Sequence, residues 1–99
     1  MSRKHRSHDT RLTSQKAYQI LNLGEAQKKV YDEIWENSMR GNYPTDQEIA
    51  RALGYGDPNK VRPRRFELME AGLVVEAGTK VCSVTKHTAL TWKINSELV

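Results

Sequence analysis

Apolar residues follow a helical spacing through the first two thirds of the chain. Ala26, Val30 and Ile34 lie four residues apart, with aromatic residues beside two of them and charged residues between. Residues at this spacing lie on one face of an α-helix. An amphipathic helix is therefore predicted over residues 25–40, and Gly41 is predicted to end it.

A second helix is predicted over residues 45–53. Thr45 and Glu48 have the spacing of a capping box, in which the hydroxyl and the carboxylate each accept a hydrogen bond from a backbone amide at the start of a helix. The apolar residues that follow at i, i+1 and i+4 form a core-facing stripe. Gly54 supplies the residue after the helix.

A third helix is predicted over residues 57–71. Asp57 and Pro58 have the pattern of an N-cap and a first helical residue. Pro63 conflicts with one continuous helix because proline lacks a backbone N–H and disfavours helical geometry in the residue before it. Either the helix bends at Pro63, or residues 58–61 form a turn and the helix begins near Pro63.

From Leu73 onward the apolar spacing changes to two, which is typical of strands. Gly78 and Thr79 are predicted to form a turn, and residues 85–87 a hairpin tip. In the last strand Leu90, Trp92 and Ile94 are expected on one apolar face. The predicted strands cover residues 74–77, 81–84 and 90–94.

Composition is consistent with one small domain that binds an anionic partner. The chain has 99 residues, a net charge of +4 and a pI of about 9.4. A positive net charge of this size favours nucleic acid or an anionic surface as the binding partner. No apolar run approaches the roughly 20 residues of a membrane helix, so no membrane contact is expected. A single cysteine, Cys82, and no visible secretory leader predict a reducing, cytoplasmic location.

The N-terminal residues differ from the rest of the chain. Residues 1–13 carry four cations against one acid and lack apolar periodicity, so a flexible basic arm is predicted. It could follow DNA phosphates or be a solvated terminus without a role. A short helix over residues 14–23 is expected next, within a single domain spanning residues 14–95. Residues 96–99 are expected to be a tail.

Three helices followed by a hairpin, with these motifs, resemble a winged helix-turn-helix domain of the small phage or prokaryotic type. The segments that carry the resemblance are Thr45–Gly54, Val61–Val74 and Trp92–Ile94. It implies an α+β fold with a three-helix core and a C-terminal antiparallel wing of two to three strands. It also implies that helix 57–71 enters the major groove of DNA, with the wing and arm on the backbone.

The charge pattern agrees with this implication. Residues 57–65 hold four cations and one acid, whereas residues 25–40 are net negative. Lysine and arginine contact phosphates, and arginine or asparagine can also contact base edges. The residues expected to contact DNA are Asn59, Lys60, Arg62, Arg64, Arg65, Lys80, Lys86, His87 and, in the arm, Arg3, Lys4 and Arg6.

Two residues of the third helix have two interpretations each. Arg65 projects near the core face, so it either faces DNA or buries its stem and pairs with a carboxylate such as Glu33. Phe66 is expected to pack on the sheet, unless a bend at Pro63 exposes it to DNA.

No enzyme is expected, because no paired-acid motif, glycine-rich phosphate loop or serine elbow is present. His5, His8, His87 and Cys82 do not have the spacing of a compact zinc finger, so neither a metal nor another cofactor is expected.

The predicted function is binding of double-stranded DNA, as a transcription regulator or a phage DNA-transaction accessory factor. The alternative is a protein-interaction module in which either the same surface or the Trp35 side docks a partner, with Tyr31 and Trp35 on helix 25–40 more exposed than a core requires. RNA binding is a weaker third interpretation. The sequence indicates neither the target site nor the oligomeric state.

Overall fold

A computed structural model of the chain describes residues 22–95. The predicted basic arm, most of the helix expected over residues 14–23 and the tail lie outside these residues. Asn22 and Leu23 are described and are not helical, and Leu23 packs against the core.

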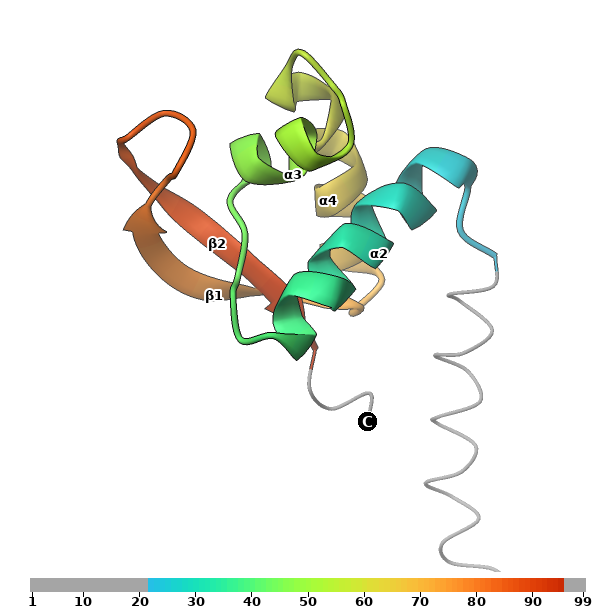
Figure 1. Ribbon diagram of the computed structural model, residues 1–99. Helices are drawn as coiled ribbons and strands as arrows, with labels where there is room; N and C mark the ends of the chain where they lie inside the picture. Colours follow the sequence, from blue (N-terminus) through green and yellow to red (C-terminus); the bar gives the residue numbers. More distant parts are fainter. Residues whose placement is uncertain (1–21, 96–99) are drawn as a thin grey trace, which may run out of the picture.

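Residues 22–95 form an α+β fold with three α-helices, one short 3₁₀ helix and a two-stranded antiparallel sheet (Figure 1). The element order is compatible with a winged-helix layout. The hairpin lies on one side of the helices, and the loop that joins its strands stands at its far end. The elements are α2 (Glu25–Met39), α3 (Asp46–Ala52), η1 (Pro58–Lys60), α4 (Arg62–Glu70), β1 (Val74–Val81) and β2 (Thr88–Ile94).

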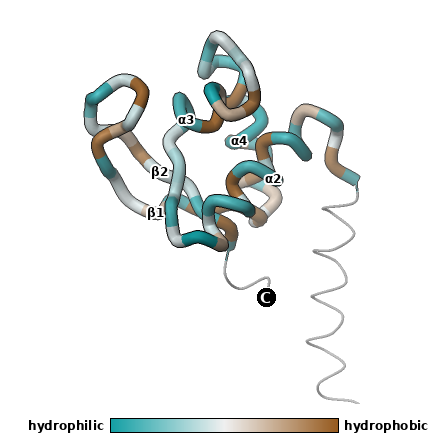
Figure 2. Tube along the Cα trace, viewed as in Figure 1, coloured by the Kyte–Doolittle hydropathy of each residue, from teal (hydrophilic) through white to brown (hydrophobic). Residues whose placement is uncertain are grey.

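The predicted helix over residues 25–40 is confirmed as α2. Val30, Tyr31 and Ile34 are its buried residues, and apolar and polar positions alternate along its trace (Figure 2). The backbone N–H of Gly24 donates to Gln27 Oε1 at 2.8 Å, which satisfies one amide before the first turn.

The capping box predicted for the second helix is also confirmed. The amide of Glu48 donates to Thr45 Oγ1 at 3.2 Å, and the amide of Thr45 donates to Glu48 Oε1 at 3.1 Å. Gly54 follows with φ +78°, a left-handed conformation that glycine adopts without steric cost.

Pro63 divides the predicted helix over residues 57–71 into two elements. Pro58–Lys60 form the 3₁₀ helix η1, capped by Asp57 Oδ1, which accepts the Asn59 amide at 2.9 Å. The α-helix proper begins at Arg62, so Pro63 lies in its first turn, where the missing N–H has no helical partner in any case. The second of the two sequence alternatives is therefore correct.

The hydrophobic core lies between the three helices and the base of the hairpin. Val61 and Leu68 are both fully buried. The backbone N–H of Trp92 donates to the Pro44 carbonyl at 3.0 Å, so the segment before α3 lies beside β2. The other apolar side chains of the core are Val30, Tyr31, Ile34, Ile49, Ala50, Leu73, Val74, Trp92 and Ile94.

The predicted division of the first part of the hairpin is wrong. Residues 74–81 form one strand, and Gly78, expected in a turn, lies at a β-bulge with φ +129°. Only Val81 of the strand expected over residues 81–84 is in a strand. The bulge places an extra residue in β1 and increases the local twist, which a period-two pattern does not reveal.

The expected apolar face of the last strand holds only at its C-terminal end. Trp92 and Ile94 are buried, but Leu90 is 44% exposed. Thr91, expected on the polar face, is buried, and its hydroxyl donates to the Gly78 carbonyl at 3.1 Å beside the bulge. The part of the hairpin beyond the bulge therefore leaves the core.

Residues 82–87 form the loop at the hairpin tip, hereafter the wing loop. The amide of Cys82 donates to the His87 carbonyl at 2.8 Å, and the amide of Lys86 donates to the Cys82 carbonyl at 2.9 Å. Lys86 has φ +66°, a left-handed conformation in a residue other than glycine. The tip predicted at residues 85–87 is confirmed.

No helix within residues 22–95 has the length and apolar character that crossing a membrane requires.

Replacing Thr45 with valine should lower the free energy of unfolding by about 1–2 kcal/mol, because the N-cap oxygen is lost while the shape is kept. Chemical denaturation followed by circular dichroism measures this. The matched control is Thr79→Val, at an exposed position in β1, where a change within about 0.5 kcal/mol is expected. Equal effects of the two substitutions would contradict the capping role.

Candidate nucleic-acid interface

The junction between η1 and α4 carries the cations predicted to meet DNA. Because Pro63 starts a new helix there, the neighbouring side chains leave the backbone in different directions. Lys60 and Arg62 are exposed, whereas Arg64 and Arg65 are partly buried. The four cations therefore do not form one equivalent set.

Arg65 is held inside the fold. Its Nε and one terminal nitrogen donate to the two carboxylate oxygens of Asp46 at 3.1 and 2.7 Å. Its guanidinium carbon lies 3.9 Å from the centre of the Trp92 ring, and the side chain is 14% exposed. These contacts favour the structural interpretation of Arg65 over the DNA-facing one.

The partner suggested for Arg65, Glu33, is wrong. The Glu33 carboxylate instead accepts a hydrogen bond from Asn37 Nδ2 at 2.8 Å, within α2. Asp46 takes its place because α3, not α2, faces this side of α4.

Arg64 is also paired, although it remains 37% exposed. Its Nε lies 3.1 Å from Glu67 Oε1, and a terminal nitrogen donates to Glu67 Oε2 at 3.1 Å. Glu67 Oε1 also accepts from Gln27 Nε2 at 2.8 Å. This chain of contacts joins α4 to α2, so Arg64 contributes less free positive charge than the sequence suggests.

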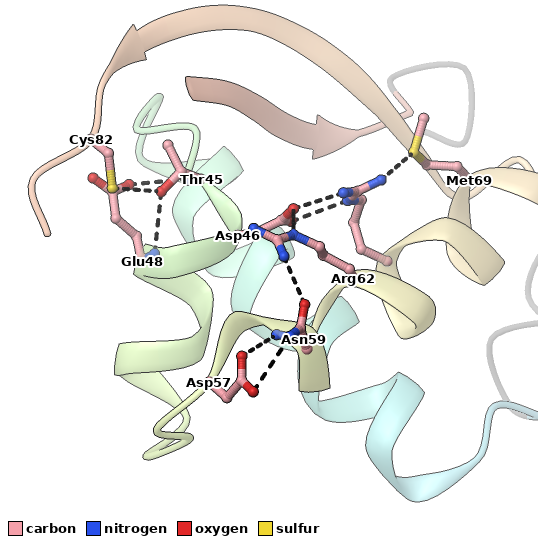
Figure 3. Close-up of polar contacts among 9 residues, drawn as sticks. Thr45, Asp46, Glu48, Asp57, Asn59, Arg62, Met69 and Cys82 are labelled. Carbon is pink, nitrogen blue, oxygen red and sulfur yellow. Dashed lines mark hydrogen bonds and ion pairs between the residues drawn. The ribbon is translucent and has the colours of Figure 1, made fainter. Parts of the chain in front are cut away.

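Arg62 is oriented by two neighbours but stays 53% exposed (Figure 3). One of its terminal nitrogens donates to Asn59 Oδ1 at 2.7 Å, and its Nε lies 3.7 Å from Asp46 Oδ2. The side-chain nitrogen of Asn59, Nδ2, in turn lies 3.5 Å from Asp57 Oδ2. Asn59 therefore uses its side chain mainly within η1 and on Arg62.

Lys60 is exposed and makes no ion pair with any residue in 22–95. Its Nζ lies 5.9 Å from the centre of the Tyr55 ring, at the outer limit of a cation–π contact. Its charge is available to a partner from solution.

The hairpin cations divide in the same way. Lys80 Nζ lies 2.9 Å from Glu48 Oε1, so it holds the hairpin against α3. Lys86 and His87 are exposed on the wing loop, and neither side chain has an ion pair among the described residues.

Two surface hollows flank the start of α4. The wing-side hollow, of about 430 Å³, lies between α3, α4 and the wing loop, and the turn-side hollow, of about 330 Å³, lies between α2, η1 and α4. Arg62 and His87 line the first, and Lys60 and Arg64 line the second. The start of α4 is therefore a ridge with cations on both sides.

The remaining predicted contacts, Arg3, Lys4 and Arg6, lie outside the described residues.

Two side chains near this ridge were not predicted as contacts. Gln47 lines the wing-side hollow, and Arg51, one turn further along α3, is exposed. Burial of Ile49 and Ala50 places both on the outer face of α3, which the apolar stripe in the sequence could have indicated. Phe66 is 55% exposed and does not pack on the sheet as expected, because α4 buries the side that carries Leu68.

Glu48, on α3, has a strongly shifted pKa. Burial raises the pKa of its carboxyl, but hydrogen bonds from the backbone and side chain of Ser83, from Lys80 and from the Thr45 amide outweigh burial and lower the pKa to about 2. The Ser83 amide donates to Glu48 Oε2 at 2.8 Å. One carboxylate thus caps α3 and holds the wing loop.

Cys82 lies beside the same cap. Its Sγ is 3.1 Å from Thr45 Oγ1. Burial raises the pKa of the thiol, but hydrogen bonds from Thr45 and from the backbone of Thr85 and Val84 lower it below the ordinary value. The side chain is fully buried, so these contacts shape the wing loop. Within residues 22–95, no three metal-ligating side chains of His, Cys, Asp or Glu lie together.

No protein-family model, curated protein or solved structure matches this chain. The function proposed below is therefore inferred from the geometry of α4 and the wing loop.

Replacing Arg65 with methionine should lower the free energy of unfolding by about 2–4 kcal/mol, because Asp46 loses its closest cation in a largely buried place. The matched substitution Arg62→Met removes an exposed guanidinium and should cost less than about 1 kcal/mol. Urea unfolding of the two variants measures the difference. Similar losses would contradict the distinct roles assigned to these arginines.

Acid should weaken the fold through Glu48. Its folded-state pKa of about 2 lies below its ordinary value of 4.5, so its contribution is present above about pH 5 and is lost as the pH falls toward 2. Glu48→Gln should remove at most about 3 kcal/mol at neutral pH and flatten the decline below pH 5.

Denaturation curves at several pH values provide this measurement. The control is Glu36→Gln, which changes a carboxylate that is 61% exposed on α2. Its free energy of unfolding should fall below pH 5 as that of the wild type does. If the stability of Glu48→Gln falls with acid as steeply as that of the wild type, the Glu48 carboxylate does not hold the wing loop against α3.

Proposed function

We propose that this chain binds double-stranded DNA as a winged helix-turn-helix protein. In this proposal α4 enters the major groove, the wing loop contacts the flanking backbone, and the N-terminal arm follows the phosphates. Transcription regulation or an accessory role in a phage DNA transaction is the task that we propose for it, in the cytoplasm.

The observation that carries the proposal is the ridge at the start of α4. The major groove of B-DNA is about 12 Å wide and admits one α-helix, with a phosphate backbone on either side. A helix start with cation-lined hollows on both flanks suits that shape. Because Arg62 and His87 line the same hollow, α4 and the wing loop can contact neighbouring parts of one duplex.

The geometry narrows the residues that we propose for DNA contact. Lys60, Arg62, Lys86 and His87 are exposed, and Arg51 adds a cation on α3. Arg64, Arg65 and Lys80 are engaged with carboxylates of the fold itself. Apolar side chains on a recognition helix contact thymine methyl groups, and exposed Phe66, one turn after Arg62, suits that contact.

A protein-interaction function is the second candidate. Trp35 is 43% exposed and Met39 57% exposed, and they lie four residues apart on α2, so together they present an apolar strip to solvent. If partner binding is the only function, duplex DNA will not bind at any salt concentration.

Binding to a labelled duplex, followed by fluorescence anisotropy over a series of salt concentrations, should weaken steeply as salt rises. Each of Lys60→Ala and Lys86→Ala should reduce the slope of log affinity against log salt by about 0.9, which is the loss of one phosphate contact.

Lys28→Ala is the matched control. Lys28 lies on α2, with its Nζ 3.1 Å from Asp32 Oδ2, and its replacement should leave the slope unchanged. Competition with structured RNA of equal length tests the RNA alternative. Absent or salt-independent binding would overturn the proposed function.

A further inference from the structure

Arg62 is more exposed than Arg64 and Arg65, at 53% against 37% and 14%, and is still held in place. Asn59 accepts a hydrogen bond from one terminal nitrogen at 2.7 Å, and Asp46 lies 3.7 Å from the Nε side. Figure 3 shows the guanidinium between these two residues. Two supports of this kind fix the plane of the guanidinium as well as its position.

The charge of this cluster is not balanced. Asp46 is a single carboxylate facing two arginines, and its shorter contacts, at 3.1 and 2.7 Å, are to Arg65. One positive charge remains. Because Arg65 is 14% exposed and Arg62 is 53% exposed, that remaining charge is presented to solvent by Arg62.

The hydrogen-bonding capacity of Arg62 is also largely unused. A guanidinium has five N–H donors in a planar fork. The contact with Asn59 uses one of them, and the Nε donor faces Asp46. The two terminal nitrogens together keep three N–H donors without a partner among residues 22–95, at least one on each nitrogen.

In the major groove, guanine presents two adjacent acceptors, O6 and N7, and a guanidinium edge can donate to both. We infer that Arg62 is a specificity-determining residue that recognises a guanine in the major groove, and that Asn59 and Asp46 are its positioning residues. This inference rests on the proposed function, because it names the base that the same helix reads.

The other candidates on this ridge do not offer such an edge. Arg65 is 14% exposed and donates to both Asp46 and Met69. Arg64 is less exposed than Arg62, and its charge is balanced by its own partner, Glu67. Lys60 is a point charge on a flexible stem, which suits a phosphate better than two fixed acceptors. Asn59 was expected to contact bases itself, but its Oδ1 is occupied by Arg62. A phosphate contact by Arg62 needs no fixed plane.

The experiment begins with selection of binding sites from randomised duplex DNA by the full chain. A guanine should be fixed at one position. Replacing that guanine with 7-deazaguanine removes the N7 acceptor and should weaken binding by about 5- to 100-fold. In Arg62→Lys, the charge and the salt slope should persist, but the discrimination between the two bases should fall, because an ammonium group has no planar fork.

Asn59 tests the positioning role. Asn59→Leu should reduce the discrimination against 7-deazaguanine, whereas Asn59→Asp keeps an acceptor for Arg62 and should retain it. This ratio of affinities is insensitive to a general loss of stability, and circular dichroism checks the fold of each variant.

The outcomes separate the inference from the function beneath it. If no duplex binds, both fail. If duplex DNA binds with the expected salt dependence but no guanine is selected, only the inference fails. The same holds if Arg62→Lys discriminates against 7-deazaguanine as strongly as the wild type, because the guanidinium then does not read the base.

Discussion

The carboxylate of Asp46 is the interaction on which the rest of the arrangement depends. It accepts two hydrogen bonds from Arg65, whose guanidinium covers the Trp92 ring. Residues from α3, α4 and β2 therefore meet at one point. This contact therefore helps to fix the rotation of α4 relative to the hairpin, and with it the side of the helix that is exposed.

The same carboxylate links stability to the proposed recognition of DNA. Because Asp46 is shared unequally, Arg65 is committed to the fold and Arg62 keeps its charge for solvent. A fold that fully neutralised both arginines would present no cation at the centre of the ridge. A fold without the acid would leave two like charges side by side and would not orient either of them.

Sequence periodicity predicted the elements that are determined by local chemistry. The helix over residues 25–40 and the capping box at Thr45 follow from spacing alone, and both are confirmed. Pro63 signalled a break but not its place, because proline is compatible with either a bend or a first turn. The bulge in β1 was missed because a single extra residue leaves no mark on a short apolar pattern.

The pairing of the cations could not be predicted for a different reason. The partner of Arg64 is Glu67, three residues further along the same helix, so this pair could have been predicted from helical spacing. Arg65 and Lys80 bind acids 19 and 32 positions away, on α3. Such partners are chosen by how the helices and the hairpin pack, so a count of charges overestimates how many remain free.

The backbone of Lys86 has a consequence for how the wing loop is built. A left-handed conformation at φ +66° disfavours any residue with a side chain, by roughly 1 kcal/mol. Glycine would relax the hairpin tip, but it would place no ammonium group there. The loop therefore carries a small conformational cost at a position that presents an exposed ammonium group to solvent.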